Sequence, residues 1–269
     1  MNIVITGGTR GIGRGLAEEF LRRGHNVVIS GRDERAVVAA VAALATRGPG
    51  QAAGAAAEVS DLLALERLWD LACQRFGRVD IWINNAGMTN RKVRLADVPS
   101  TEIAAVISTN LTGLAYGCQV ALRGMLQQGG GKLFNMEGFG SDGLTQEGMT
   151  IYGATKRAVR YLTASLVKEY KDTPVMICNL SPGIVVTEFL TRDLYAHDPS
   201  ALDQRRRILN LLADRVETVA PALVDGILHV SKSGASVRWM TPMQALGRVA
   251  MSPFRKRDPF TPTESKAPR

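Results

Sequence analysis

Short apolar runs alternate with helical segments along most of the chain, and this alternation limits the folds that the sequence can adopt. The runs typical of strands lie at 2–6, 26–30, about 52–59, 79–84, 131–136 and 174–181. Helical patterns fill the intervals, at about 15–24, 33–48, 61–76, 100–127 and 150–171. Strands that are apolar throughout, rather than at every second residue, indicate a sheet that is covered on both faces. The pattern predicts an α/β domain with a parallel, doubly wound sheet between helices.

The length of the chain and the lack of any linker in it indicate one domain. A chain of 269 residues suits one large α/β domain or two small ones, and no repeat or low-complexity segment divides it. We expect the domain to span 1–252. Residues 187–215 are polar and helical without a strand, which predicts a lid inserted above the sheet. Residues 253–269 contain four prolines and mixed charges, and we expect a flexible basic tail.

The charge of the chain is a weak guide to its partners. The formal net charge is +8, which could match a nucleic acid, an anionic membrane surface or an anionic cofactor. The positive residues are spread over many elements, and no run of five or more like charges appears. We therefore expect no nucleic-acid partner.

Cysteine and histidine usage predicts no metal site. Cys73, Cys118 and Cys178 lie far apart without CxxC spacing, which is typical of reduced thiols in a protein core. The three histidines show no ligand spacing either.

The sequence predicts neither a membrane span nor a leader. No stretch reaches the ~18 apolar residues of a transmembrane helix. The first strand is expected to begin at about residue 2, which leaves no room for a signal or transit peptide in this chain. Either the protein acts where it is made, or a targeting segment lies outside this sequence.

A glycine-rich turn, TGGTRGIG (6–13), joins the first strand to the first helix. Gly7, Gly11 and Gly13 let backbone N–H groups approach a pyrophosphate, whose charge is favoured by the helix N-terminus. A lone glycine motif would fit a plain turn about equally well. Its strand–turn–helix setting in the first βα unit favours a dinucleotide site.

The end of the second strand indicates which dinucleotide binds. An acidic residue at this point would bond the ribose of NAD, but this chain has Gly31 and Arg32 there. Arg10 in the glycine loop adds a second guanidinium, and two arginines suit a 2′-phosphate. Asp33 comes too late in the chain and is predicted to cap the next helix. The predicted cofactor is therefore NADPH.

The segment IYGATKR (151–157) contains a tyrosine and a lysine at helical spacing. Tyr152 and Lys156 would share one face of a helix, where the ammonium would favour the tyrosinate. We expect this charge, with that of the nicotinamide, to lower the tyrosine pKa from its usual value of about 10. A tyrosine tuned in this way can protonate a carbonyl oxygen. For the isolated pair of residues, an ordinary surface helix is the alternative.

Together with NNAG (84–87), STNLTG (108–113) and SPGIVVT (181–187), these motifs resemble the short-chain dehydrogenase/reductase superfamily over about 1–240. The resemblance implies a Rossmann fold, with one domain and a parallel seven-stranded sheet between helices. It implies that Tyr152 is the catalytic acid, that Lys156 also binds the nicotinamide ribose, and that Asn110 anchors a water linking Lys156 to solvent. Members of this superfamily usually form homodimers or homotetramers, which we expect here.

The resemblance also adds residues to the expected cofactor site. Asn84, Ala86 and Gly87 would stabilise the fourth strand and line the cofactor, and Pro182, Gly183 and Thr187 would hold the carboxamide. The remaining expected contacts are Thr9, Ile12, Val59 and Val185.

The catalytic serine departs from the family pattern. Phe139 stands where that serine usually lies, within the segment FNMEGFGSDG (134–143). We predict that Ser141 polarises the substrate carbonyl and is delivered by a longer loop. Gly138, Gly140 and Gly143 are expected to let this loop curl through positive φ. Backbone N–H groups of 137–140 are the alternative donors.

This loop, with NLLADRVETVA (210–220) and SPFRKRD (252–258), is similar to the chlorophyll b reductase group of the superfamily. The similarity implies NADPH-dependent reduction of the C7 formyl group of chlorophyll(ide) b to a hydroxymethyl group. It implies a setting in the bacterial cytoplasm, or in the chloroplast stroma or at the thylakoid surface, with peripheral membrane contact. A general reductase of ketones or 3-oxoacyl groups would share every catalytic residue.

A chlorin would need a wide apolar pocket above the sheet. The side chains expected to line it, unless they only pack in the core, are Phe189, Leu190, Leu194, Tyr195, Ile208, Leu209, Leu211 and Leu212.

Overall fold

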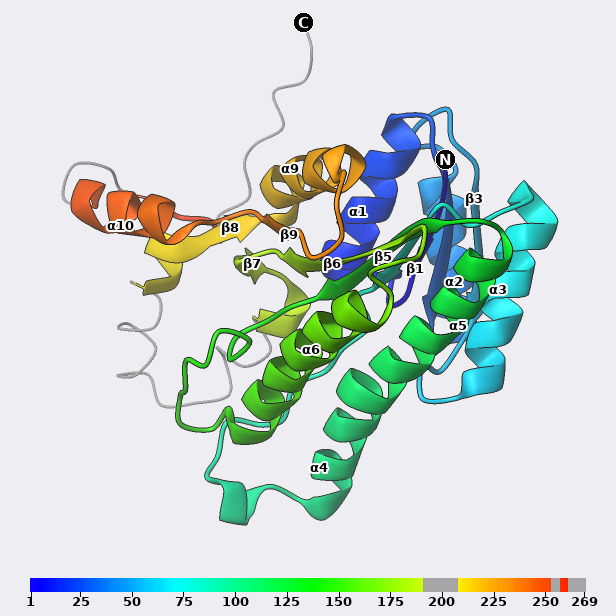
Figure 1. The fold of residues 1–269 in the computed structure, drawn as a ribbon. Coiled ribbons are helices and arrows are strands. Elements are labelled where there is room, and N and C mark those ends of the chain that lie inside the picture. The colour runs from blue at the N-terminus through cyan, green and yellow to red at the C-terminus, as the bar shows by residue number, and fades with distance from the viewer. Residues whose placement is uncertain (191–207, 253–256, 261–269) are drawn as a thin grey trace, which may run out of the picture.

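The computed structural model describes residues 1–190, 208–252 and 257–260 (Figure 1). Its strands are β1 (Asn2–Ile5), β2 (Asn26–Gly31), β3 (Ala52–Ala56), β4 (Ile81–Asn84), β5 (Gly131–Met136), β6 (Val175–Ser181), β7 (Ile184–Val186), β8 (Ala213–Arg215) and β9 (Ser236–Arg238). Its α-helices are α1 (Gly11–Arg22), α2 (Glu34–Leu44), α3 (Leu62–Phe76), α4 (Ser100–Ile107), α5 (Gly113–Gln127), α6 (Thr150–Glu169), α9 (Val216–His229) and α10 (Pro242–Met251). A short 3₁₀ turn (Leu95–Asp97) precedes α4, and a π-helical turn (Ser108–Thr112) joins α4 to α5.

Seven strands form one sheet in the order β3-β2-β1-β4-β5-β6-β9, and every neighbouring pair is parallel. This confirms the predicted doubly wound fold. The strand order reverses between β1 and β4, and doubly wound folds bind their ligands at the carboxyl edge of the sheet beside such a reversal.

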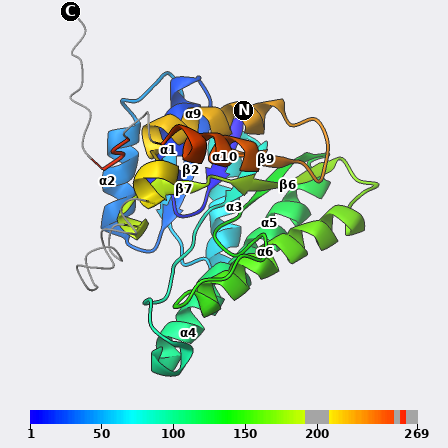
Figure 2. The same ribbon diagram turned by 90° about the vertical axis from the view of Figure 1, so that its left-hand side faces the viewer.

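Helices cover both faces of the sheet (Figures 1 and 2). Ile3 and Ile5 of β1 point into the core shared with α1, α2 and α9, whereas Val4 points into the core shared with α3, α5 and α6. Both faces of β1 are therefore buried, which explains why Ile3, Val4 and Ile5 are apolar at successive positions.

One expectation about the inserted segment was wrong. Residues 187–215 were predicted to hold no strand, yet β8 lies in that range and pairs in parallel with β7 in a separate two-stranded sheet. The strand β8 is only three residues long, and its sequence ADR lacks the apolar pattern of a strand. It is a strand because it pairs with β7. The rest of the predicted lid and tail, 191–207, 253–256 and 261–269, including Leu194 and Tyr195, lies outside the described residues.

A buried carboxylate connects β8 to the C-terminal part of the chain. Asp214 accepts hydrogen bonds from Trp239 Nε1 at 2.6 Å, from Arg248 at 2.7 Å and from Arg257. Arg257 also donates to the carbonyl oxygen of Leu211 at 2.6 Å. These bonds hold β9, α10 and the first residues after 256 against β8.

The helical run Ser100–Gln127 is, within the described residues, the one helix long and apolar enough to cross a membrane by length and composition alone. Leu114, Cys118 and Met125 of this run pack into the core with α3 and α6. This is how a core helix of a globular domain is arranged.

A close approach between α5 and β4 fixes the end of that strand. Asn84 accepts from Trp82 Nε1 at 2.8 Å and donates to Asn135 Oδ1 at 2.9 Å. A Cβ on Gly117 of α5 would overlap Asn84 Oδ1. The lack of a side chain at Gly117 therefore leaves Asn84 free to join β4 to β5.

Gly117→Ala should lower the free energy of unfolding by about 1–3 kcal/mol, because the added methyl group overpacks the site and displaces Asn84. Gly153→Ala on α6, where nothing lies within 4 Å of the new Cβ, is the control. It should be neutral or stabilising by up to about 1 kcal/mol through helix propensity. Chemical denaturation measures both variants, and equal midpoints would contradict the close packing of Asn84 on α5.

Candidate active site

The structure brings the predicted site residues together at the carboxyl ends of the strands. They lie in the loop after β1 and the first turn of α1 (Gly7, Thr9, Arg10, Gly11, Ile12, Gly13), at the end of β2 and just after it (Gly31, Arg32), after β3 (Val59), at the end of β4 and in the loop that follows (Asn84, Ala86, Gly87), in the π turn (Asn110), after β5 (Ser141), on α6 (Tyr152, Lys156) and from the end of β6 to just after β7 (Pro182, Gly183, Val185, Thr187).

The loop after β1 has the form of an anion cradle. Gly7 and Gly11 adopt φ of +67° and +58°, and a Cβ on Gly13 would overlap Asn85 Nδ2. Helix α1 begins at Gly11 without a side-chain cap from Arg10 and without an acidic residue in its first turn. The N–H groups of that turn are thus left for a ligand, and this arrangement fits the pyrophosphate of a dinucleotide.

The segment after β7 lies beside the glycine loop. A Cβ on Gly11 would lie 3.5 Å from Thr187 Cγ2. A hollow of about 260 Å³ opens beside this contact, between α1, the end of β7 and the start of α9. Arg10 reaches across to Glu188, with 3.0 Å between Nη1 and Oε2, and both side chains are exposed. The side chain of Val185 packs in the core, and its predicted contact with the cofactor stays a prediction.

The end of β2 partly follows the sequence prediction. Asp33 caps α2 by accepting the Ala36 N–H at 2.8 Å, as predicted. Gly31 lies against Thr9 of the glycine loop, where a Cβ would come within 2.7 Å of Thr9 Cγ2. The Arg32 side chain is exposed beside this contact. The pairing of Arg10 with Glu188 was not predicted.

The π turn directs Asn110 toward α6. Asn110 is buried; its Oδ1 accepts the Met88 N–H at 2.8 Å, and its Nδ2 donates to Met88 O at 2.8 Å and to Thr155 Oγ1 at 3.1 Å. Thr155 in turn donates to the carbonyl oxygen of Tyr152 at 2.7 Å. Asn110 therefore ties the loop after β4 to the helix that carries Tyr152. The sequence motif indicated Asn110 but neither the π turn nor Thr155.

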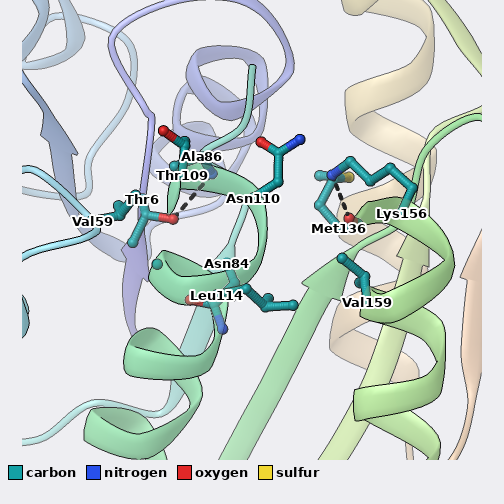
Figure 3. Close-up of a pocket in the computed structure, with 11 residues that line it drawn as sticks. Thr6, Val59, Asn84, Ala86, Thr109, Asn110, Leu114, Met136, Lys156 and Val159 are labelled. Atoms are coloured by element: carbon teal, nitrogen blue, oxygen red, sulfur yellow. Dashed lines mark hydrogen bonds between the residues drawn. The ribbon is translucent and has the colours of Figure 1, made fainter. Parts of the chain in front are cut away.

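A small cavity lies between Asn110 and Lys156 (Figure 3). Its volume is about 10 Å³, close to the room that one water molecule needs. Thr6 and Asn84 add polar groups to its wall. The cavity is compatible with the predicted water between Asn110 and Lys156.

Tyr152 is buried, and its ring packs on Phe189 with 5.9 Å between centroids. Its hydroxyl lies against Gly138, where a Cβ would overlap Oη. Within the described residues Oη makes no hydrogen bond, so its proton is available to a substrate. Burial raises the pKa of Tyr152, opposite to the direction expected from the sequence.

The position of Lys156 explains this difference. Its Nζ donates to Met136 O at 3.1 Å and lies 5.8 Å from the centre of the Tyr152 ring, and so it does not bond the tyrosine hydroxyl. Burial lowers the pKa of Lys156 to about 8, although the Glu137 carboxylate opposes the shift. Spacing on α6 placed the two residues on one face, but their depth in the protein decides the direction of both pKa shifts.

Ser141 is buried and lies in the same wall of the site. Its Oγ accepts the Gly138 N–H at 3.1 Å, and the Tyr152 hydroxyl lies against Gly138 too. The N–H groups of Glu137 and Gly138 are already bonded, to Leu180 O and Ser141 Oγ, which weakens the alternative that they bind an oxyanion. The role of Ser141 as the polarising hydroxyl stays a prediction.

The loop uses its glycines in two ways. Gly140 and Gly143 have φ of +92° and +97°, as expected, but Gly138 does not adopt positive φ. Gly138 is required because any side chain there would overlap the Tyr152 hydroxyl. The same loop carries Glu137, a buried carboxylate that was not predicted as a site residue.

Comparisons with known proteins show which proteins this chain resembles. The family described as short chain dehydrogenase matches residues 1–196. Chlorophyll(ide) b reductase NOL of Arabidopsis thaliana is 36% identical over 257 residues, which cover 92% of this chain and 72% of that protein. The 3-oxoacyl-[acyl-carrier-protein] reductase FabG of Chlamydia pneumoniae is 31% identical over 186 residues, 69% of this chain and 74% of that protein.

Among solved structures, levodione reductase superposes with a TM-score of 0.80 at 25% identity, covering 91% of this chain and 97% of that one.

Tyr152→Phe should lower kcat for carbonyl reduction by about 10²–10⁴-fold, because it removes the unbonded hydroxyl at the centre of the site. Binding of the nicotinamide cofactor, followed by its fluorescence, should change little. Tyr161→Phe on the same helix, with a side chain that is 76% exposed, is the control and should match the wild type. A Tyr152→Phe variant with normal kcat would show that another group donates the proton.

Proposed function

The chain belongs to the short-chain dehydrogenase family, and we propose that it reduces the C7 formyl group of chlorophyll b or chlorophyllide b with NADPH. The observation that carries this proposal is the extent of the similarity. The match to chlorophyll(ide) b reductase covers 92% of the chain, whereas the match to the 3-oxoacyl reductase covers 69%. The additional similarity favours a shared substrate as well as shared chemistry.

The reaction adds a hydride to the formyl carbon and a proton to the formyl oxygen, which gives a hydroxymethyl group. NADPH held at the glycine loop would supply the hydride and become NADP⁺. Tyr152 supplies the proton, and its raised pKa keeps it protonated at neutral pH until the substrate arrives. The Lys156 ammonium, below the ring, stabilises the tyrosinate that forms.

Ser141 would bind the formyl oxygen during this step. Its oxygen accepts the Gly138 N–H, which leaves the hydroxyl hydrogen free to point to a substrate. The donor would be held in place before charge develops, because the bond to Gly138 fixes the Ser141 rotamer. A fixed donor stabilises an oxyanion without reorganisation.

Apolar side chains near Tyr152 suit a flat, apolar substrate. Phe189 packs on the Tyr152 ring and is still 43% exposed. Phe139 and Leu144, from the loop that borders Tyr152, are exposed large hydrophobic residues. Such surface is costly in water and would be covered by a chlorin ring. Ile208, Leu209, Leu211 and Leu212, which were expected to line the pocket, are exposed or half-buried.

The direct test is to incubate the protein with NADPH and chlorophyllide b and to follow the red absorption band, with chromatography of the product. We expect conversion to 7-hydroxymethyl chlorophyllide a, and no conversion by Tyr152→Phe. Turnover of simple ketones or 3-oxoacyl thioesters without turnover of the pigment would instead support a general carbonyl reductase, which needs the same catalytic residues.

Arg32→Asp should lower the ratio of kcat/KM for NADPH to that for NADH by about tenfold or more, because it places a negative charge where the 2′-phosphate is expected. Arg35→Asp, an equally exposed arginine in the first turn of α2, is the control and should keep the ratio. An unchanged ratio in Arg32→Asp would mean that the 2′-phosphate is bound elsewhere. Arg10 would then be tested next, since its surface ion pair with Glu188 is weak.

Two further parts of the proposal concern partners and location. We expect a homodimer or homotetramer that contacts a membrane surface peripherally, where a phytylated pigment would be found. The Arabidopsis relative is named as chloroplastic. For this chain, the bacterial cytoplasm and the chloroplast both stay predictions.

A further inference from the structure

Glu137 is an acidic side chain buried directly after β5. It is 5% exposed, and its N–H donates to Leu180 O at 2.8 Å, which continues the pairing of β5 with β6. Asn135, two residues earlier, donates to Thr163 of α6. Because alternate residues of a strand face the same way, the Glu137 side chain also faces α6.

Two cations on α6 lie opposite this carboxylate. Arg160 Nε is 4.0 Å from Glu137 Oε1, and Lys156, one turn earlier, bonds the carbonyl of Met136 next to Glu137. Even so, Glu137 Oε1 has no hydrogen-bond partner within the described residues.

Within the part of the chain that the structure describes, the other polar groups in the cavity wall and ring contact beside Lys156 carry no charge at neutral pH. They are Asn110 from the π turn, Asn84 from β4 and Tyr152 from α6 itself. Burial lowers the pKa of Lys156, and Glu137 is the group that raises it.

A buried carboxylate oxygen that accepts no hydrogen bond costs stability, because the charge loses its hydration and gains too little in return. The charge of Glu137 is only weakly compensated, since Arg160 lies at the distance limit of an ion pair and its side chain is partly exposed. Buried charged groups with weak compensation are common at functional sites. The position of Glu137 beside Lys156 indicates which function it serves.

We propose that Glu137 is a positioning residue that keeps Lys156 in its ammonium form inside the buried site. The proposal rests on the proposed function only so far as Tyr152 and Lys156 reduce a carbonyl group, whichever carbonyl that is. The ammonium is the charge that stabilises the Tyr152 tyrosinate. Without Glu137, burial would favour a neutral amine, and the tyrosinate would form without the ammonium beside it.

The direction of the pH effect follows from these charges. Lys156 is charged below its pKa, and so the reduction rate falls as pH rises through that value. In Glu137→Gln, burial still lowers the pKa of Lys156, but the opposing carboxylate is gone. The alkaline limb of the rate profile should therefore move to lower pH. Ionisation of Tyr152 lies at higher pH, because burial raises its pKa.

The test compares Glu137→Gln with the wild type in kcat/KM against pH, from about pH 6 to about pH 10. We expect rates near those of the wild type at the acidic end. For a shift of about one pH unit, the charged fraction of Lys156 and with it the rate should fall about fivefold near pH 8 and about tenfold near pH 10. Glu137→Asp keeps the charge and should restore much of the profile. Asp142→Asn, on the exposed part of the same loop, is the matched control.

Two readouts without turnover complete the test. The melting temperature of Glu137→Gln should equal or exceed that of the wild type, because a buried charge that is only weakly paired with Arg160 is removed. NADPH binding, measured by fluorescence, should weaken as pH rises and Lys156 loses its charge, because Lys156 is expected to bind the nicotinamide ribose. This weakening should begin at a lower pH in Glu137→Gln than in the wild type.

The proposal would be overturned if the alkaline limb of kcat/KM and the pH dependence of NADPH binding were the same in Glu137→Gln as in the wild type. So would a lower melting temperature with equal loss of activity at every pH, which would indicate a structural role. If the pigment is not reduced, a ketone or aldehyde that is reduced gives the same pH comparison. The proposed substrate can thus be wrong while the proposed role of Glu137 is right. If no carbonyl compound is reduced, the pH dependence of NADPH binding still tests the role of Glu137.

Discussion

The site depends on how α6 is held against the carboxyl end of the sheet. Buried polar bonds fix this helix along its length: Asn90 Oδ1 accepts the Tyr152 N–H at 3.2 Å, Lys156 donates to Met136 O, and Asn135 donates to Thr163 at 3.0 Å. Asn110 adds a bond to Thr155 from the π turn. Bonds of this kind are directional, whereas apolar packing alone would tolerate rotation of the helix. They set the position of Tyr152 relative to the sheet edge, where doubly wound folds bind their ligands.

Burying α6 in this way has an electrostatic consequence. Desolvation disfavours the charged form of each group, and so it raises the pKa of Tyr152 and lowers that of Lys156. Both shifts favour a neutral pair at rest. A protonated tyrosine is what a general acid requires, but a neutral lysine could not stabilise the tyrosinate. The protein therefore needs a further charge to keep Lys156 protonated, and Glu137 is the buried carboxylate on this side of α6 that raises the pKa of Lys156.

Features with a local cause were predictable from the sequence. The first six strands of the sheet, the helices between them, the glycine loop, the Asp33 cap and the shared face of Tyr152 and Lys156 all follow from spacing within a few residues. Strands β7 and β9 and helices α9 and α10 were not predicted. Features caused by distant parts of the chain were not. The short polar strand β8 exists because β7 lies beside it, and the direction of the Tyr152 pKa shift follows from its depth under the loop after β5. The surroundings of Glu137 likewise come from β6 and α6, which lie far from it in sequence.

The path of the loop after β5 determines where Ser141 and Glu137 lie relative to α6. Gly138 must lack a side chain because the Tyr152 hydroxyl occupies that space, and a Cβ on Gly140 would lie 2.7 Å from Gly153 Cα on α6. The chain can pass so close to α6 only because glycine at Gly140 takes φ of +92°. This turn brings Ser141 back so that its Oγ accepts the Gly138 N–H, while Glu137 at the start of the loop faces α6. A single segment thus places both the hydroxyl proposed to bind the substrate oxygen and the carboxylate proposed to keep the lysine charged.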